Sequence, residues 1–486
     1  MTDRPATAVP GPGQVTAIPA QLEPDAIGVA QDTVIGMASS APTVTVGITL
    51  ASLAVASAYA SLPVILVTAI PMLIIANSYR RLNLWKANCG ASFEWVGRSI
   101  DPYLGFMTGW LMITAYIVGA VAGVEVLGPS VLAIFNSSAG VWGDIAIATG
   151  VSLVMLIITI VGIRLTARTQ VAMAVVEYAI LIAIAIWGLV VVLQHHPGTY
   201  PITRQWFSLS GIGGKGSLAS GLLIAVFIYS GWDGTLYVNE EVKHRRANPG
   251  KAAVYAVILL TAIYILTNLG LSGVVSPAKL QANSTSSLVY VAGVLGGGGW
   301  AKAMAFSLAL SVIALTGTSI LLGARIIYGM ASHRVLPSFL GTVNRRFSTP
   351  VAASVVVGVL LIAITWIYLL ATSVQNAFDS VVNVSGLLFA GFYVMTALAT
   401  IAYYRRRVIA TVWDALLLGI LPLAAALFLI WIIFRSMQLA PAQQNWSLVG
   451  IIGLGLILLL VARFVYRSPF FQIPRESAPR KAAGND

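Results

Sequence analysis

Charged side chains are scarce in this chain of 486 residues, where Asp, Glu, Lys and Arg together make up 9%. A water-soluble globular domain carries about 25% of these residues. Hydrophobic residues account for 58% of the chain, and the mean hydropathy is +0.89. This composition excludes an ordinary soluble fold and indicates that lipid or neighbouring helices surround most of the chain.

Cysteine and histidine are also rare. Because Cys89 is the single cysteine, no disulfide can form within the chain and no thiolate metal cluster can be built. All four histidines fall in predicted loops, and the motifs HExxH, GxSxG and GK[ST] are absent. An intramembrane enzyme would need a nucleophile or metal ligands at membrane depth. We therefore expect no enzyme, no bound metal and no cofactor.

Long apolar runs fill most of the chain. A helix needs roughly 20 apolar residues to span the hydrocarbon core, and hydrocarbon cannot satisfy an open backbone, so each such run is predicted to be a helix. About twelve runs qualify: 27–53, 61–79, 103–127, 145–163, 171–193, 217–241, 252–273, 303–323, 351–370, 382–404, 414–434 and 447–466. The predicted fold class is an all-α polytopic membrane protein with about twelve transmembrane helices.

The basic residues are distributed unevenly between the two sides of these helices. With the N-terminus inside, the outer segments hold only Arg204, Lys215, Lys279, Lys302 and Arg435. Basic loops stay in the cytoplasm, so both termini are predicted to be cytoplasmic in a cell membrane. Residues 1–26 are predicted to be a disordered tail, 194–216 an extracellular loop and 467–486 a second tail. The net charge of +12 then reflects topology and predicts no nucleic-acid partner.

Two of the predicted helices contain breaks. The first holds Ala38-Ser39-Ser40-Ala41-Pro42, and Pro42 removes a backbone donor and disfavours helix at Ala41. The sixth holds Ser230-Gly231-Trp232-Asp233-Gly234. Breaks in helices one and six suggest two five-helix repeats, 27–193 and 217–404, followed by two accessory helices in 405–466. The alternative is that glycine and proline only kink these helices or let neighbours pack closely.

A break at mid-membrane frees amides and carbonyls that must face water or a polar guest. Half-helix N-termini favour an anionic group and C-terminal carbonyls favour a cation, so a zwitterion fits between two breaks. The sequence therefore predicts a small-molecule solute as partner, besides the lipid bilayer. The predicted solute-binding residues are Ala38, Ser39, Ser40, Ala41, Phe227, Ser230, Gly231, Trp232 and Asp233.

Three stretches resemble the amino acid–polyamine–organocation (APC) permeases. They are SGWDGTLYVNEEVKHRRANPGKA (230–252), GASFEWVGRSIDPYLGFMTGW (90–110) and GARIIYGMASHRVLPSFLGTVNRRFSTPV (323–351). The resemblance covers about 27–407 in the family's order. It implies a 5+5 inverted repeat with discontinuous helices one and six, two accessory helices, and a solute at the bilayer centre.

Individual positions follow the family only in part. Helix one lacks the family's Gly-Ser-Gly, so an unmodified α-amino acid is a less certain solute. In similar antiporters for arginine and agmatine, an aromatic gate occupies the position of Phe227 and an acid that of Asp233. Glu177 stands where the fifth helix of family members often has a lysine, at the position of a sodium ion in sodium-coupled relatives. The resemblance thus implies a titratable group at Glu177.

The acids predicted to lie well inside spans are Asp32, Glu125, Glu177 and Asp233. Each costs about 2.5–3.5 kcal/mol at mid-helix, so each is a functional candidate. Glu177 is predicted to carry the coupling proton, or alternatively to hydrogen-bond permanently to Ser or Thr on helix one or eight. Asp233 binds a substrate amine or locks the unwound backbone. Asp32 belongs to an inner gate or faces a cytoplasmic cavity, and Glu125 is better read as a vestibule acid.

Hydroxyls in the eighth helix give one further candidate site. Thr316, Thr318 and Ser319 could hold sodium together with helix one, accept a hydrogen bond from Glu177, or serve as ordinary contacts between helices. A proton is the expected coupling ion, with sodium left open.

The expected function is secondary transport of an amino acid, polyamine or related small organic cation by alternating access, as a symporter or antiporter. An uncoupled exchanger or facilitator, and a non-transporting sensor with a permease fold, are the alternatives. The sequence leaves the identity of the solute and the oligomeric state open.

Overall fold

The computed structural model describes residues 21–47, 49, 61–209, 215–283, 286–371 and 374–479. Within these ranges the regular elements are helices, accompanied by two isolated β-bridges. Eleven helices in this part of the chain are long and apolar enough to cross a membrane. The predicted class, an all-α polytopic membrane protein, is confirmed.

The first transmembrane helix is interrupted where the sequence predicted. α1 (Val29–Ser40) ends at Ala41, whose φ of 45° lies in the left-handed region, and residues 42–47 are again helical. Pro42 opens this second half, where its missing N–H costs nothing and its fixed φ suits a helix start. Residues 48 and 50–53 of the predicted span 27–53 lie outside the described residues. The interrupted first helix is not among the eleven candidates.

The sixth helix is interrupted too. α8 (Lys215–Ile228) stops before Gly231, whose φ of 104° is a conformation that favours glycine. The chain continues as two short 3₁₀ turns, η4 (Trp232–Leu236) and η5 (Asn239–Glu241). The expected span 217–241 is therefore α-helical only as far as Ile228, because the glycine-containing break ends the α-helix.

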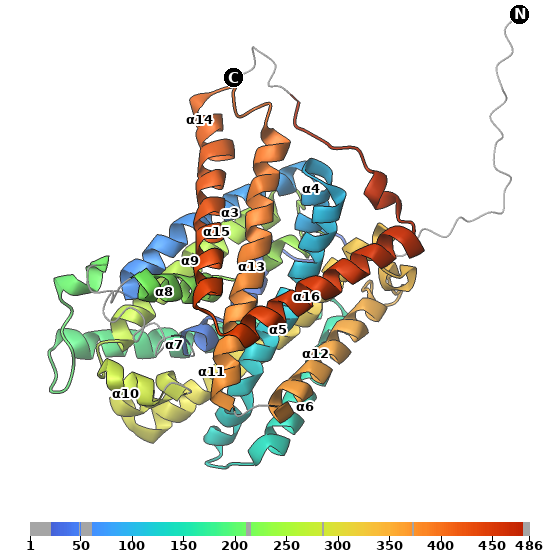
Figure 1. The fold of residues 1–486 in the computed structure, drawn as a ribbon. Coiled ribbons are helices and arrows are strands. Elements are labelled where there is room, and N and C mark those ends of the chain that lie inside the picture. Colours follow the sequence, from blue (N-terminus) through green and yellow to red (C-terminus); the bar gives the residue numbers. More distant parts are fainter. Residues whose placement is uncertain are drawn as a thin grey trace, which may run out of the picture.

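Figure 1 labels the remaining helices, which pack together in one bundle. They are α3 (Ser61–Trp85), α4 (Ser92–Ser99), α5 (Pro102–Ile134), α6 (Gly140–Val161), α7 (Ile163–Leu193), α9 (Asn248–Leu271), α10 (Pro277–Ala282), α11 (Ser287–Ser332), α12 (Val351–Ala371), α13 (Val374–Tyr404), α14 (Val412–Ala415), α15 (Leu421–Leu439) and α16 (Ala442–Leu460). The predicted span 303–323 lies within α11, which continues to Ser332 and has the non-helical residue Gly297 before that span.

Small residues bring the two broken helices into direct contact. A Cβ atom on Gly36 would lie 2.7 Å from the Thr235 side chain and 2.9 Å from the Trp232 carbonyl oxygen. A Cβ atom on Gly231 would lie 2.5 Å from the Ser39 carbonyl oxygen. Only glycine allows this approach, so the breaks of helices one and six face each other in the bundle.

Candidate substrate site between the two helix breaks

The backbone of the helix-six break is held by side chains from three other helices. Ser39 Oγ donates to the Gly231 carbonyl oxygen, and the Tyr393 hydroxyl accepts the Gly231 N–H at 3.3 Å. The Tyr116 hydroxyl lies 3.4 Å from the same Gly231 oxygen. These contacts satisfy peptide groups that lipid could not satisfy. They join α1, α5 and α13 at the break.

A small cavity of about 20 Å³ lies beside the two breaks, which is room for about one water molecule. Ser39, Ser40, Phe227 and Ser230, four of the predicted solute-binding residues, line it. The other lining residues come from the second half of helix one, α5, α11 and α13: Thr45, Ala115, Tyr116, Gly119, Leu315, Ser319, Ser385 and Phe389.

The lining combines apolar rings with hydroxyls whose bonding capacity is unused. Phe227 and Phe389 contribute the rings. Ser319 Oγ and Ser385 Oγ are buried and make no hydrogen bond. Buried polar groups are normally hydrogen-bonded, so these two hydroxyls are suited to polar atoms of a guest. Among the described residues, no Asp, Glu, Lys, Arg or His lines the cavity.

Asp233 is fully buried and surrounded by three tyrosines. The hydroxyl of Tyr393 donates to Asp233 Oδ1 at 2.6 Å, that of Tyr116 to Oδ2 at 3.1 Å, and that of Tyr237 also to Oδ2. A carboxylate that accepts three such bonds is well satisfied without a substrate amine. These contacts favour the lock on the unwound backbone, one of the two roles considered from the sequence.

Trp232, Ala38 and Ala41 do not line the cavity, although the sequence grouped them with the solute-binding residues. The Trp232 ring is stacked on Tyr393 with centroids 5.3 Å apart and meets the ring of Tyr79 edge-on. Ala41 forms the left-handed residue of the helix-one break itself. Gly231 and Asp233 do not line the cavity either, so a role of these five residues in solute binding stays a prediction.

Glu177, in α7, contacts helix one but does not line the cavity. Its Oε1 accepts the backbone N–H of Thr43 at 3.3 Å, just past the break. Ser311 neighbours this carboxyl, and its Oγ is 3.4 Å from the Val44 N–H. The first N–H groups of a helix have no intrahelical partner, and a carboxylate there is favoured by the helix dipole. Glu177 therefore binds the start of the second half of helix one, which is the outer half in the predicted topology.

The hydroxyls singled out in the predicted eighth helix, which is α11, make different contacts. Thr316 Oγ1 donates to the Val312 carbonyl at 2.8 Å and Thr318 Oγ1 to the Ala314 carbonyl at 3.0 Å, both within α11. These are the ordinary helix contacts considered from the sequence. Ser319 differs, because its hydroxyl is unpaired and faces the cavity.

Asp32 lies in α1 below the break, fully buried, and neither carboxylate oxygen has a hydrogen-bond partner. It takes no part in the polar contacts that join helices at that end of the bundle. Its role in an inner gate stays a prediction. The side chain of Glu125 lies outside what the structure describes.

A second polar cluster closes the bundle at the end where α1 begins, which we call the basic end because it carries Lys86, Arg98, Lys243 and Arg325. Glu241 forms two hydrogen bonds to Arg325, at 3.0 and 2.9 Å, and both side chains are fully buried. The Glu241 carbonyl also accepts the N–H groups of Ala26 and Ile27, and Lys243 N–H bonds back to Ile27. This cluster ties the start of α1 to the end of the helix-six region.

We expect Arg325→Met to destabilise the protein strongly, because it leaves the Glu241 carboxylate buried without its partner. Breaking a buried pair in this way costs about 3–5 kcal/mol. Thermal unfolding in detergent checks this. Arg164→Met is the matched control, since Arg164 pairs with Glu23 in solvent, where such pairs contribute about 0–1 kcal/mol. Equal melting temperatures for the two variants would contradict the expectation.

The geometry now allows comparison with known proteins. A family model described as "Amino acid permease" matches residues 31–457. This chain belongs to the amino acid permease family. The match covers both breaks, Glu177 and the Glu241–Arg325 pair, and it places the protein in the APC superfamily, as the sequence motifs predicted.

Relatives of this permease match over part of their length. The arginine/ornithine antiporter ArcD2 of Lactococcus lactis is 21% identical over 56% of this chain and 59% of that protein. The human Asc-type amino acid transporter 1 is 30% identical over 29% of this chain and 27% of that protein. The human large neutral amino acids transporter small subunit 2 is 27% identical over 36% and 32%.

Two solved structures share the fold. A manganese transporter from Eremococcus coleocola has a TM-score of 0.58 at 13% identity, covering 93% of this chain and 99% of that one. MhsT, solved in complex with L-phenylalanine, has a TM-score of 0.58 at 16% identity, covering 85% and 99%. Identities this low establish the fold alone. They agree with the all-α polytopic fold of this chain.

Several site residues were not found from the sequence. Nothing in the local pattern marks Tyr116 of α5, or Tyr393, Ser385 and Phe389 of α13, because they lie in continuous helices. Tyr237 lies only four residues after Asp233, beyond the break, but it was not singled out. Ser311, rather than Thr316 or Thr318, is the hydroxyl beside Glu177. The one available signal was the presence of isolated Ser and Tyr residues in otherwise aliphatic helices, and that signal is common in membrane proteins.

Proposed function

We propose that this permease is a secondary transporter of a neutral amino acid, driven by protons and working by alternating access in the cell membrane. The observation that carries the proposal is the cavity between the two helix breaks, with free hydroxyls and no charged lining among the described residues. The basic end of the bundle faces the cytoplasm in this proposal, since basic residues concentrate there.

The lining favours a neutral over a cationic side chain. A permanent positive charge brought next to this cavity would need an anionic partner to offset its desolvation. Asp233 is the nearest candidate, but three tyrosine hydroxyls already occupy its oxygens. The zwitterionic backbone of an amino acid has groups of both signs and is served by freed peptide groups at the breaks. This narrows the wider class of amines and organic cations expected from the sequence.

Glu177 is the proposed proton site. Its charged form accepts the Thr43 N–H and holds the outer half of helix one, and its protonated form accepts this bond more weakly. Binding and release of one proton would then bias the position of that half-helix. Sodium in place of the proton is the alternative. A sodium site would require available hydroxyls near the break of helix one. Thr316 and Thr318 instead donate their hydroxyls to carbonyl oxygens of their own helix.

Transport by the reconstituted protein tests the proposal. We expect saturable uptake of labelled L-alanine or L-phenylalanine that increases when the interior is made more alkaline and is unaffected by replacing sodium with choline. L-arginine and putrescine should compete poorly. Uptake of those two cations without competition by neutral amino acids would instead favour a cationic solute. Failure to transport any of the four, in protein that is folded, would contradict a transport function.

Removal of a cavity hydroxyl should weaken solute binding modestly. Ser385→Ala removes one unpaired hydroxyl from the lining, and a single hydrogen bond contributes about 0.5–1.5 kcal/mol, which corresponds to a rise in KM of about 2- to 10-fold. Ser436→Ala is the matched control, because Ser436 Oγ is also buried and unpaired but lies away from the cavity. An unchanged KM for Ser385→Ala would remove this residue from the site.

A further inference from the structure

The segment after the last transmembrane helix folds back over the basic end of the bundle. After α16 and its π-helical extension, residues 466–479 run across that end toward α13 and α14, in red in Figure 1. We call this segment the C-terminal strap. The sequence predicted a cytoplasmic tail over 467–486. Within the described residues of that tail, Phe470 and Ala478 are buried against the protein.

The strap is fitted closely to α4. The Phe470 ring is stacked on Phe93 with centroids 4.3 Å apart. A Cβ atom on Gly97 would lie 2.4 Å from the tip of the Phe470 ring, so a glycine is needed to seat it. Further along, Glu476 donates its N–H to the Arg98 carbonyl at 2.7 Å and accepts from the Arg98 guanidinium at 2.8 Å.

The strap also bonds to the ends of two transmembrane helices. Ser468 Oγ donates to the His333 carbonyl at 2.7 Å, at the end of α11. Ala478 N–H donates to the Tyr403 carbonyl at 2.8 Å, at the end of α13. The strap thus links α4, α11 and α13, which are far apart in the sequence.

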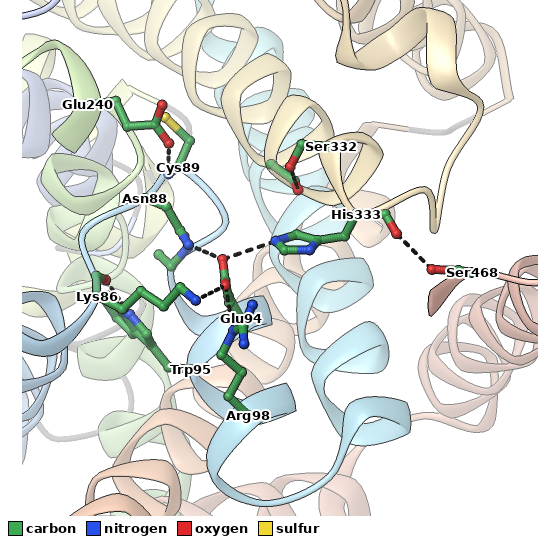
Figure 2. A network of polar contacts seen from close by, with 12 residues as sticks. Lys86, Asn88, Cys89, Glu94, Trp95, Arg98, Glu240, Ser332, His333 and Ser468 are labelled. Atoms are coloured by element: carbon green, nitrogen blue, oxygen red, sulfur yellow. Dashed lines mark hydrogen bonds and ion pairs between the residues drawn. The ribbon is translucent and has the colours of Figure 1, made fainter. Parts of the chain in front are cut away.

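Beneath the strap, the Glu94 carboxylate is the common partner of several polar and charged side chains (Figure 2). Its carboxylate meets Lys86 at 2.7 Å, Arg98 at 2.6 Å and His333 at 3.1 Å, and it accepts a hydrogen bond from Asn88. Burial opposes the charged form, but His333 and Lys86 outweigh it and lower the pKa of Glu94 to about 2. A carboxylate with a lowered pKa loses its stabilising contribution only as the pH falls below the usual range toward 2. The Glu94 carboxylate therefore stays charged at physiological pH.

On its other side, α4 is connected to the end of helix six. The loop before α4 offers the Cys89 N–H to Glu240 at 3.0 Å, and Asn239 Nδ2 donates to the Asn88 carbonyl at 2.9 Å. Glu241, which follows Glu240 in the chain, forms the buried ion pair with Arg325. The same loop is thus held to the helix-six region on one side and, through Glu94, to α11 and the strap on the other.

We propose that the C-terminal strap is an intramolecular restraint that holds the basic end of the transporter closed through α4. The inference rests on the proposed alternating-access function, in which this end must open once in each cycle. When this end opens, helix six either separates from the loop before α4 or moves together with that loop. The strap resists the joint movement, because it fixes α4 to α11 and α13. Release of the strap shifts the population toward the open form.

Cys89 provides a native reporter, because it is the chain's single cysteine, is buried, and lies in the loop that joins α4 to helix six. We expect the double variant Phe470→Ala/Ser468→Ala to react with a small maleimide several-fold faster than the unaltered protein. Gln472→Ala is the matched control, since this exposed residue lies in the strap between the contacts and should leave the rate unchanged. The labelling is performed on full-length protein in proteoliposomes without solute.

Glu476→Gln is the milder variant, because it removes one ion pair and keeps the backbone bond to Arg98. We expect a smaller increase in the rate of Cys89 labelling, in protein that elutes as a single species. Labelling rates equal to the unaltered protein in every folded strap variant would overturn the restraint. Since labelling requires no transport, this result is separate from a failure of the uptake assay, which would instead contradict the proposed function.

Discussion

Glu177→Gln is expected to abolish accumulation of solute against its gradient while leaving exchange in place. With one proton per solute, a gradient of one pH unit supplies about 1.4 kcal/mol and supports about a tenfold concentration ratio. The glutamine side chain cannot release a proton, so the variant should reach a ratio of about one. Its amide oxygen can still accept the Thr43 N–H, so the outer half of helix one keeps its contact. Accumulation of labelled solute in proteoliposomes with an imposed pH gradient measures this.

Ser307→Ala serves as the control at the same depth, because its hydroxyl donates only to the Glu177 backbone carbonyl, at 3.1 Å. It should accumulate solute as the unaltered protein does. If Glu177→Gln retained a tenfold ratio, the coupling proton would have to bind elsewhere, and Asp32, buried and unpaired, would be the next residue to replace. Exchange of internal for external solute reports that the variant is folded and active.

Gly231→Ala should reduce transport at least tenfold. A side chain in the left-handed region costs about 1–2 kcal/mol, and here the new Cβ would also lie 2.5 Å from the Ser39 carbonyl oxygen. The strain must be relieved by moving the two breaks apart, which disturbs the peptide groups proposed to bind the solute. About 1.4 kcal/mol corresponds to a tenfold change in rate. Initial uptake rates, with the melting temperature of the purified variant, test this.

Gly453→Ala is the matched control for that substitution. Gly453 lies within α16, and a Cβ atom there would meet no heavy atom within 4 Å. This variant should transport normally and melt at or slightly above the temperature of the unaltered protein, since alanine favours a helix. A Gly231→Ala variant with the rate of the unaltered protein would show that close contact between the breaks is not needed for transport.

The departure of helix one from the family pattern has a structural explanation. The family's Gly-Ser-Gly is absent, yet the helix still breaks, because Ala41 takes the left-handed conformation and Pro42 starts a new helix. The break thus depends on Pro42, which disfavours helix at the preceding residue. Ser39 and Ser40 then line the cavity with side chains, where glycines would leave bare backbone. The uncharged lining among the described residues is consistent with a neutral solute.

Much of the architecture could be predicted from the sequence, since each transmembrane helix depends on local properties. Twenty apolar residues in a row must form a helix in lipid, and Pro42 or Gly231 weakens such a helix wherever it packs. The sequence also indicated the charged residues that are costly to bury, including Glu177 and Asp233. Family motifs supplied the order of the elements. None of these conclusions required knowledge of which helices are neighbours.

Which groups meet was decided only by the tertiary structure. Tyr116 and Tyr393 reach Asp233 from α5 and α13, and no local pattern relates residues so far apart in the chain. The strap is a similar case, because Phe470 and Glu476 look like parts of a polar tail until α4 is placed beneath them. A transfer free energy depends on one residue and its solvent, whereas a hydrogen bond depends on two residues that the fold brings together.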